Sequence, residues 1–253
     1  MKTIIRATGK RALNAFQSSC VALVRVAGLI DYPVPPNSSI RHYYSSGVSC
    51  ALPIATMALH HGVPLLRGGT AERVNVLDFG CGSGRELLQF TRQFPNPQYF
   101  GCDADADEVE FLRKQYPSVQ TARLTKDTVL PYEDQRMDAI YSVSTMWRLH
   151  PELQLAWLKE LHRVTRVGGM CFLSTDGFQA LASFGVRDSD RWLLERGVLH
   201  QEENGFRTVV SPEYIRRTWP ESGFRVVDVI EGIICGLNSR RQDLVVLRRP
   251  GRA

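Results

Sequence analysis

One stretch constrains the fold of this chain more than any other: residues 74–88, which read VNVLDFGCGSGRELL. Its first half is a short apolar run, which is typical of a buried strand. Gly80, Gly82 and Gly84 then alternate with other residues, and good helix formers follow. A strand, a glycine turn and a helix bring backbone close to a ligand, because a side chain would block the approach. The order predicts an α/β fold that binds its ligand at the carboxyl end of this strand, beside Asp78.

The spacing of the glycines separates two classes of cofactor. Dinucleotide sites use G-x-G-x-x-G, whose third glycine permits close contact between helix and strand. This chain has G-x-G-x-G instead, and Arg85 stands where that third glycine would be, which disfavours a nicotinamide oxidoreductase. A second acidic residue, Asp103, ends the next apolar run and is placed to bind ribose hydroxyls. The glycine loop with an acid at both strand ends resembles the S-adenosylmethionine site of class I methyltransferases.

The chain after residue 74 alternates strands and helices, which predicts a parallel sheet with right-handed crossovers. The last two predicted strands are joined by a segment too short for a crossover helix, so they are expected to form an antiparallel hairpin. The fold class is therefore α/β and Rossmann-like, with a seven-stranded, mostly parallel sheet, a final hairpin and helices on both faces. Strands are predicted at 74–79, 98–102, 119–124, 138–143, 169–175, 224–231 and 242–248, and helices near 85–94, 105–115 and 152–165.

Two parts of the chain are expected to lie outside this repeating pattern. Residues 1–36 form a basic amphipathic arm and a Pro-rich linker, and residues 37–253 form the main domain. A segment from 40 to 66, helical around 51–61, leads into the first strand and carries Arg41, Tyr43 and Tyr44. Residues 176–220 are an aromatic-rich, irregular insertion above the strand ends, which suits a substrate lid. Most of its aromatic residues are expected to form a small core of their own.

The net charge of +5 comes from the first thirty residues, which hold five basic residues and no acid. The rest of the chain carries 26 basic and 26 acidic residues, so nucleic acid is disfavoured as a partner, because a nucleic-acid reader carries its excess charge on the domain. The arm itself has three interpretations. It is a helix packed on the domain, a helix lying on anionic lipid, or an organellar transit peptide.

The composition gives a first indication of the cellular setting. Six scattered cysteines without a C-x-x-C pair indicate neither a disulfide framework nor a zinc site. No apolar window approaches the roughly 18 residues of a membrane span. We therefore expect a cytoplasmic protein that is monomeric or homodimeric. Residues 1–30 would allow it to bind a membrane surface.

The resemblance narrows to class I methyltransferases of the type 11/25 group, and within them to a bacterial subgroup of glycan and natural-product biosynthesis. It extends over residues 33–249 and rests on several motifs together. They lie at 35–36, 77–85, 101–103, 130–132, 153–161, 163–164 with 168–169, 211–214 and 242–247.

The resemblance implies S-adenosylmethionine as the cofactor and assigns positions to it. The glycine loop and its acid would line the methionine portion, through Asp78, Gly80, Cys81, Gly82 and Gly84. Asp103 would accept both ribose hydroxyls, with Ala104 beside the adenine. The adenine ring would pack on Leu124 and Thr125, and Ser142 with Val143 would lie under the sulfonium.

The substrate side departs from the subgroup. Where relatives tend to carry a histidine, this chain has Thr145-Met146, Asp176-Gly177 and Phe206-Arg207. Histidine chemistry therefore does not transfer from the relatives, so either the acceptor differs or the base has moved.

Other residues of this chain are candidates for the acceptor side. His150 and Asp176 are the candidate general bases, although His150 precedes a helix and Asp176 stands where it would cap the lid. Trp147 is a candidate substrate wall, and Arg148 has the geometry to bind a carboxylate. Tyr44 and His200 are further substrate contacts. No residue set has metal-ligand spacing, so no metal is expected.

These observations predict a methyltransferase that acts on a small molecule or a biosynthetic intermediate. O-methylation is favoured, and a carboxylate acceptor needs no base, which fits the missing histidines. Two alternatives remain: methylation of a lipid-linked or membrane-held acceptor, and a non-catalytic partner subunit that binds the cofactor.

Overall fold

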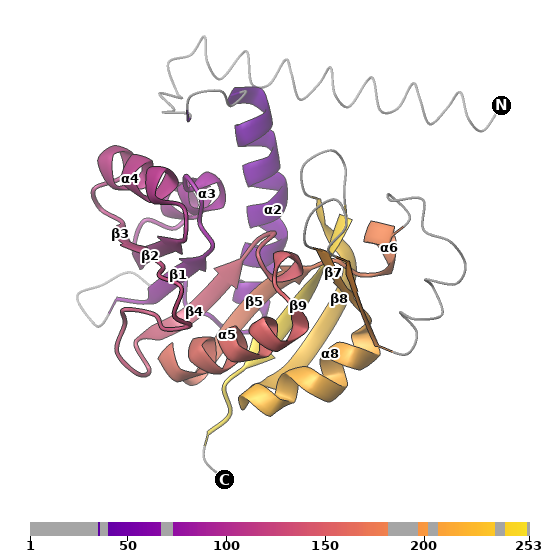
Figure 1. Cartoon of the computed structure of the whole chain (residues 1–253). Coiled ribbons are helices and arrows are strands. Elements are labelled where there is room, and N and C mark those ends of the chain that lie inside the picture. Colours follow the sequence, from indigo (N-terminus) through magenta and orange to yellow (C-terminus); the bar gives the residue numbers. More distant parts are fainter. Residues whose placement is uncertain are drawn as a thin grey trace, which may run out of the picture.

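The computed structural model describes residues 35, 40–66, 73–181, 197–201, 207–235 and 241–251 (Figure 1). The predicted arm at 1–30, nearly all of the linker and part of the 176–220 insertion lie outside the described residues. So do the side chain of Arg41 and residues Phe184, Arg187, Arg191, Trp192 and Phe206. Within the described residues, no helix is long and apolar enough to cross a membrane.

A seven-stranded sheet forms the centre of the molecule, with strand order β3-β2-β1-β4-β5-β9-β8 (Figure 1). The first five strands in this order are parallel, and β9 is antiparallel to both of its neighbours. The predicted sheet and its final hairpin are thus confirmed. The strands are β1 (Asn75–Phe79), β2 (Gln98–Asp103), β3 (Gln120–Arg123), β4 (Met137–Ser142), β5 (Thr165–Thr175), β8 (Arg225–Cys235) and β9 (Arg241–Arg248).

Helices cover both faces of the sheet, and local capping fixes where several of them begin. Asp105 accepts hydrogen bonds from the backbone of the first turn of α4, and Ser211 does the same for α8. The described helices are α2 (Ile40–His60), α3 (Arg85–Gln93), α4 (Ala106–Gln115), α5 (Pro151–Val164), α6 (Phe178–Leu181) and α8 (Pro212–Thr218), with short 3₁₀ turns η1 (Met146–Arg148) and η2 (Trp219–Ser222).

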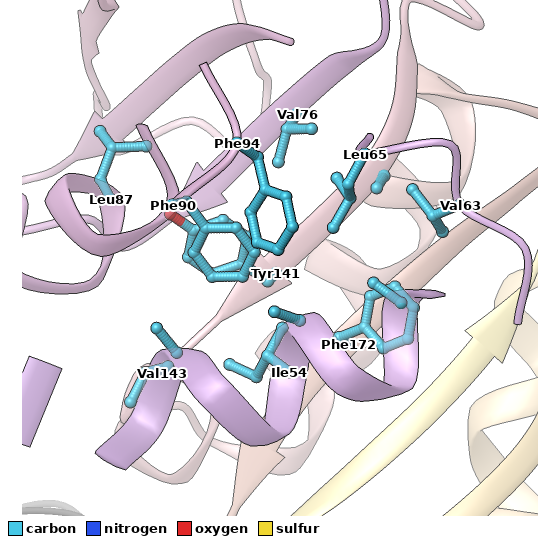
Figure 2. Packing of buried hydrophobic residues seen from close by; sticks show 14 of the residues in the cluster. Ile54, Val63, Leu65, Val76, Leu87, Phe90, Phe94, Tyr141, Val143 and Phe172 are labelled. Carbon is cyan, nitrogen blue, oxygen red and sulfur yellow. The ribbon is translucent and has the colours of Figure 1, made fainter. Parts of the chain in front are cut away.

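The apolar core lies on the two faces of the sheet. Figure 2 shows one face, where Ile54 of α2, Phe90 of α3 and Phe94, the residue that follows α3, point toward Tyr141 of β4. The Phe90 and Tyr141 rings stack with their centroids 4.4 Å apart. On the other face α5 and α8 bury apolar residues such as Leu161 and Ile215 against the strands. Because these large side chains are closely packed, the strand ends, and hence the site, are held in fixed positions.

Helix α2 is longer than the sequence predicts, since it begins at Ile40 rather than near residue 51. Its first half is rich in serine and contains a glycine, which are weak helix formers in isolation. Packing on α3 outweighs this propensity. A Cβ atom at Gly47 would lie 2.7 Å from the backbone oxygen of Arg85, so the glycine permits the close approach of the two helices.

The 176–220 insertion contains more regular structure than the predicted irregular segment. Strands β6 (Val198–Gln201) and β7 (Arg207–Val210) form an antiparallel pair, and α8 follows. Trp219, at its end, is 1% exposed and packs in the main core with Phe224. This aromatic residue therefore serves the core of the domain rather than a separate core of the insertion.

Candidate functional site

The loop between β1 and α3 is built from residues with left-handed backbone. Gly80, Gly82 and Gly84 have φ of +78°, +50° and +88°. The backbone N–H groups of Gly80 and Cys81 donate to the oxygen of Cys102 on β2, at 2.8 and 3.0 Å. Because only glycine adopts such angles without strain, the sequence pattern dictates this turn.

Each glycine of the loop has a different neighbour. A Cβ atom at Gly80 would overlap the hydroxyl of Thr145, and one at Gly84 would meet the side chain of Leu112 at 2.5 Å. At Gly82 a Cβ atom would meet nothing within 4 Å. Gly80 and Gly84 are thus required by packing within the protein, whereas Gly82 faces open space, where a ligand has room to approach the backbone.

Asp103 lies beside this open position at the end of β2. One carboxylate oxygen accepts from the backbone N–H of Gly82 at 2.8 Å, and the other accepts from the N–H of Asp105 at 3.0 Å. Ala104 is exposed. The backbone N–H of Leu124 donates to the backbone oxygen of Asp103 at 2.8 Å. The acid, Ala104 and Leu124 are therefore neighbours, while the exposed Thr125 follows Leu124.

A second carboxyl group, Asp78, is buried below the loop and is 2% exposed. Burial raises the pKa of Asp78 well above its usual range, and the nearby Glu86 carboxylate raises it further. The Tyr141 hydroxyl is its hydrogen-bonding neighbour and acts in the opposite direction, to lower the pKa of the carboxyl group. Because ionising a buried carboxyl group is costly, this position favours a polar or cationic ligand group.

Glu86 is a site residue that sequence reasoning missed. It lies in the first turn of α3, is 5% exposed and pairs with the guanidinium of Arg85 at 2.7 Å. The sequence feature that could have revealed it is an acidic residue two positions after Gly84, at the positive end of the helix dipole. Two buried carboxyl groups and one guanidinium therefore stand together at the head of α3.

Helix α2 lies against the glycine loop and partly screens it from solvent. The Tyr43 hydroxyl donates to the backbone oxygen of Ser83 at 2.9 Å, and Arg85 donates to the hydroxyl of Ser46 at 3.2 Å. Tyr44, a predicted substrate contact, is half-buried and packs beside Tyr43 and Leu88. It therefore has a packing role in this structure.

The end of β4 is fixed to β1 next to the loop. Ser142 is fully buried, and its hydroxyl donates to the backbone oxygen of Phe79 at 2.6 Å. Val143 follows and is 7% exposed. The two residues thus lie at the end of β4 next to Phe79, at the carboxyl ends of neighbouring parallel strands.

Comparison with known proteins fits this geometry. Residues 76–169, from β1 into β5, match the family model described as a methyltransferase domain. Over these residues the chain is similar to known methyltransferase domains. The cofactor of this family is S-adenosylmethionine. The open space at Gly82, the buried carboxyl group of Asp78 and the carboxylate of Asp103 suit its methionine and ribose groups.

Individual relatives of the methyltransferase domain act on different substrates. The fatty-acid O-methyltransferase of Mycolicibacterium smegmatis is 33% identical over 106 residues, covering 42% of this chain and 38% of that protein. The tRNA N(3)-methylcytidine methyltransferase Mettl2 of Drosophila melanogaster is 26% identical over 117 residues, covering 43% of this chain and 36% of that protein. The chain thus spans well under half the length of these relatives.

Solved structures extend the comparison to the fold. The glycopeptide N-methyltransferase MtfA superposes with a TM-score of 0.57 at 16% identity, covering 81% of this chain and 90% of the other. The methyltransferase fold therefore continues beyond residue 169, through the antiparallel end of the sheet.

Asp176, a predicted base of the methyltransferase, is fully buried. The amide of Gln242 donates to one of its oxygens at 2.9 Å, and the Arg207 guanidinium lies 3.7 Å from the other. The oxygen of the Gln242 side chain accepts from Ser144 and Ser174, at 2.9 and 3.1 Å. The network holds the Asp176 carboxyl group at a fixed position between β9 and β7.

The structure brings together the two predicted histidines of the methyltransferase, His150 and His200, with ring centroids 4.7 Å apart. His150 is exposed and caps α5, since its Nδ1 atom accepts from the backbone N–H of Glu152 at 3.4 Å. Thr208 donates its single proton to the oxygen of Leu149 at 2.6 Å, so His200 Nδ1 donates to Thr208. The histidine pair therefore joins the β6–β7 hairpin to the start of α5.

Trp147 lies on the acceptor side of the methyltransferase between two arginines. The guanidinium carbon of Arg148 is 4.5 Å from the centre of the indole ring, and that of Arg207 is 5.4 Å from it. Sequence reasoning proposed Arg148 for the acceptor but gave Arg207 no role. Its position was not predictable because it comes from the β7 strand of the insertion.

Asp243, near the start of β9, is expected to make the stability of the protein depend on pH. Burial raises its pKa to about 6, although the Gly232 N–H donates to it at 2.8 Å. The folded state therefore binds this proton more tightly than the unfolded state, whose pKa is about 3.9. The contribution of Asp243 to the free energy of unfolding is therefore greatest below about pH 4, and it decreases as the pH rises from there to about 6.

In the wild type this decrease in the free energy of unfolding amounts to roughly 3 kcal/mol at most. We expect it to be absent from the Asp243→Asn variant. Thermal unfolding between pH 4.5 and 7.5 measures it. Asp228→Asn, at an exposed position of the neighbouring strand, is the matched control for removal of one carboxylate. Parallel stability profiles for the wild type and Asp243→Asn would contradict the prediction.

Proposed function

We propose that the protein transfers a methyl group from S-adenosylmethionine to an oxygen of a small molecule or biosynthetic intermediate, with a carboxylate as the favoured acceptor. The main support for binding of the methyl donor is the loop at Gly82, which is open toward Asp103 and lies above the buried Asp78. The relative that methylates fatty acids supports an acidic acceptor. The near-neutral charge of residues 31–253 gives no support to a tRNA substrate such as that of Mettl2.

The bound cofactor supplies an activated methyl group, so the protein has to align the acceptor and exclude water. In this proposal Asp78 and Asp103 hold the donor, and α2 screens the loop through Tyr43. A carboxylate acceptor brings its own negative charge and requires no general base. This suits a site in which Asp176 is buried in a network and His150 caps a helix.

Calorimetric titration with S-adenosylmethionine and its demethylated product tests the donor half of this proposal. We expect micromolar binding of both compounds and none of NAD. The Asp103→Ala variant should bind each roughly ten- to a hundredfold more weakly, since a hydrogen bond to a charged group contributes about 1.5–3 kcal/mol. Absence of binding by folded wild-type protein would show that the glycine loop is structural.

Transfer of a labelled methyl group to a panel of carboxylic acids, alcohols and amines tests the acceptor half. A base-labile methyl ester is the expected product. Cofactor binding without transfer to any member would favour a non-catalytic partner subunit instead.

The basic residues at 1–30 support the second candidate, an acceptor held at a membrane. Liposome sedimentation of the full chain against one without residues 1–30 tests it. Equal partitioning of the two proteins onto anionic vesicles would exclude this role of the arm.

A further inference from the structure

Positive charge is concentrated around one aromatic ring at the carboxyl-end edge of the sheet. Arg148 and Arg207 both approach the Trp147 ring, although they are 59 positions apart in the sequence. A guanidinium over an indole face is held at a fixed orientation by cation–π attraction. Planar donors fixed in this way match the two oxygens of a carboxylate.

Each guanidinium is also fixed by a contact on its own side. The Nε atom of Arg148 donates to the backbone oxygen of Ser144 at 3.1 Å. Ser144 has a φ of +62°, which is uncommon for a residue with a side chain, and its N–H donates to Ser174 at 2.8 Å. Strained backbone of this kind is retained where the surrounding structure over-determines it, often at functional sites.

Arg207 is fixed by the buried Asp176, which Gln242 holds in turn. Asp176 lies directly after β5, and β7 meets it there, because the N–H of Val210 donates to its backbone oxygen at 3.0 Å. The same hairpin positions His200 near His150. The insertion thus brings Arg207 to Asp176 after β5 and to Trp147 in the turn after β4.

The charges of this cluster do not cancel. Asp176 compensates Arg207, whereas no carboxylate of the described residues pairs with the exposed Arg148. Burial lowers the pKa of Arg207, which means that its charge is incompletely solvated. Among the described residues, the Arg148 guanidinium is therefore available beside the indole ring for an anionic group.

We propose that Trp147, Arg148 and Arg207 bind the carboxylate that is methylated, and that Asp176 is the residue that positions Arg207. The inference rests on the proposed methyl transfer and names its acceptor class as a carboxylic acid. An oxygen lone pair of the acid forms the new O–CH₃ bond, while the electrons of the S–CH₃ bond stay on sulfur. The negative charge of the acid and the positive charge of the donor both disappear, and no proton moves.

This charge balance separates substrate from product. The acid carries the charge that the two guanidinium groups recognise, whereas the methyl ester is neutral. Product therefore loses the ion pairs that held the substrate, and its release is favoured. The predicted base Asp176 has no proton to accept in this reaction, which agrees with its burial in the network.

Binding of laurate and of aromatic and dicarboxylic acids, measured by calorimetry in the presence of the demethylated cofactor, tests the site. We expect at least one acid to bind, and its methyl ester and alcohol to bind roughly tenfold more weakly or not at all. Arg148→Gln and Arg207→Lys should each weaken acid binding about tenfold, with cofactor affinity within about twofold of the wild type. Arg225→Gln is the matched control. Arg225 is the first residue of β8 and lies at the opposite end of the strands from the cluster around Trp147.

The role of Asp176 requires a separate measurement. Asp176→Asn should raise KM for the acid several-fold while kcat stays within a few-fold and the pH–rate profile keeps its shape. Loss of a general base would instead lower kcat by about 10²–10⁴. Asp176→Glu, which retains the charge, should recover part of the acid affinity if the variant is folded by thermal unfolding.

The outcomes separate this inference from the proposed function. Protein that does not bind S-adenosylmethionine would contradict both. Protein that binds it, but methylates alcohols as well as acids or binds no acid in the panel, would overturn the anion site alone. Acid binding that is unchanged in both Arg148→Gln and Arg207→Lys would overturn it as well.

Discussion

The Gly82→Ala variant is expected to fold and yet to bind S-adenosylmethionine at least about tenfold more weakly than the wild type. Its methyl group meets no protein atom within 4 Å, so the only internal cost is the φ of +50°, about 1–2 kcal/mol. The methyl group instead occupies the open space where the cofactor approaches. Calorimetry measures the affinity, and thermal unfolding measures the stability.

Gly80→Ala is the matched comparison, because it adds the same methyl group two residues earlier. There the group overlaps the Thr145 hydroxyl in addition to the strain at φ +78°, so we expect a loss of stability of about 2–4 kcal/mol. The two variants should therefore differ in the property that each one damages. Equal loss of stability in both, or unchanged cofactor affinity in Gly82→Ala, would contradict the assignment of Gly82 to the ligand.

Cofactor affinity is expected to rise with pH because of Asp78. Burial and the Glu86 carboxylate raise the pKa of Asp78 well above its usual range, so the free protein holds a proton there at lower pH. S-adenosylmethionine carries a net positive charge and favours the ionised carboxylate. Binding must therefore release this proton, and each unit of pH below the pKa of free Asp78 weakens affinity by up to about tenfold.

Calorimetry in buffers of different ionisation enthalpy measures the number of protons released. We expect a release approaching one proton for the wild type at a pH below the pKa of free Asp78, and none for Asp78→Asn, which should also lose the pH dependence of affinity. Asp138→Asn, on the neighbouring strand, is the matched control for loss of one carboxylate, since Asp138 binds the N–H of Asn75 at the opposite end of β1. A wild-type affinity that is independent of pH, with no proton released, would contradict the role of Asp78.

The donor side of the site was predictable because its determinants are local in sequence. Gly80, Gly82 and Gly84 require the left-handed backbone that the structure shows. Asp78 and Asp103 each end an apolar run, and adjacent parallel strands bring those ends together. The parallel sheet followed from the alternation of strands and helices, whereas the order of the strands came from the structure.

The acceptor side was less predictable because its contacts span long distances in sequence. Asp176 is a reasonable base in a linear sequence, and only the structure places it between Gln242 of β9 and Arg207 of β7. The pairing of β6 with β7 depends on packing against the domain rather than on a strong strand pattern. Likewise the first half of α2 forms because Gly47 fits against α3, which no propensity scale records.

The position of β9 has a consequence for the order in which the protein becomes functional during synthesis. Contacts among β1, β2 and β4 join residues that are at most about seventy positions apart, so the donor half can assemble while the ribosome is still extending the chain. Strand β9 inserts between β5 and β8, and it pairs Met170 with Arg248. Gln242 reaches Asp176 only once β9 is in place. The nascent protein should therefore bind its methyl donor before it can recognise an acceptor.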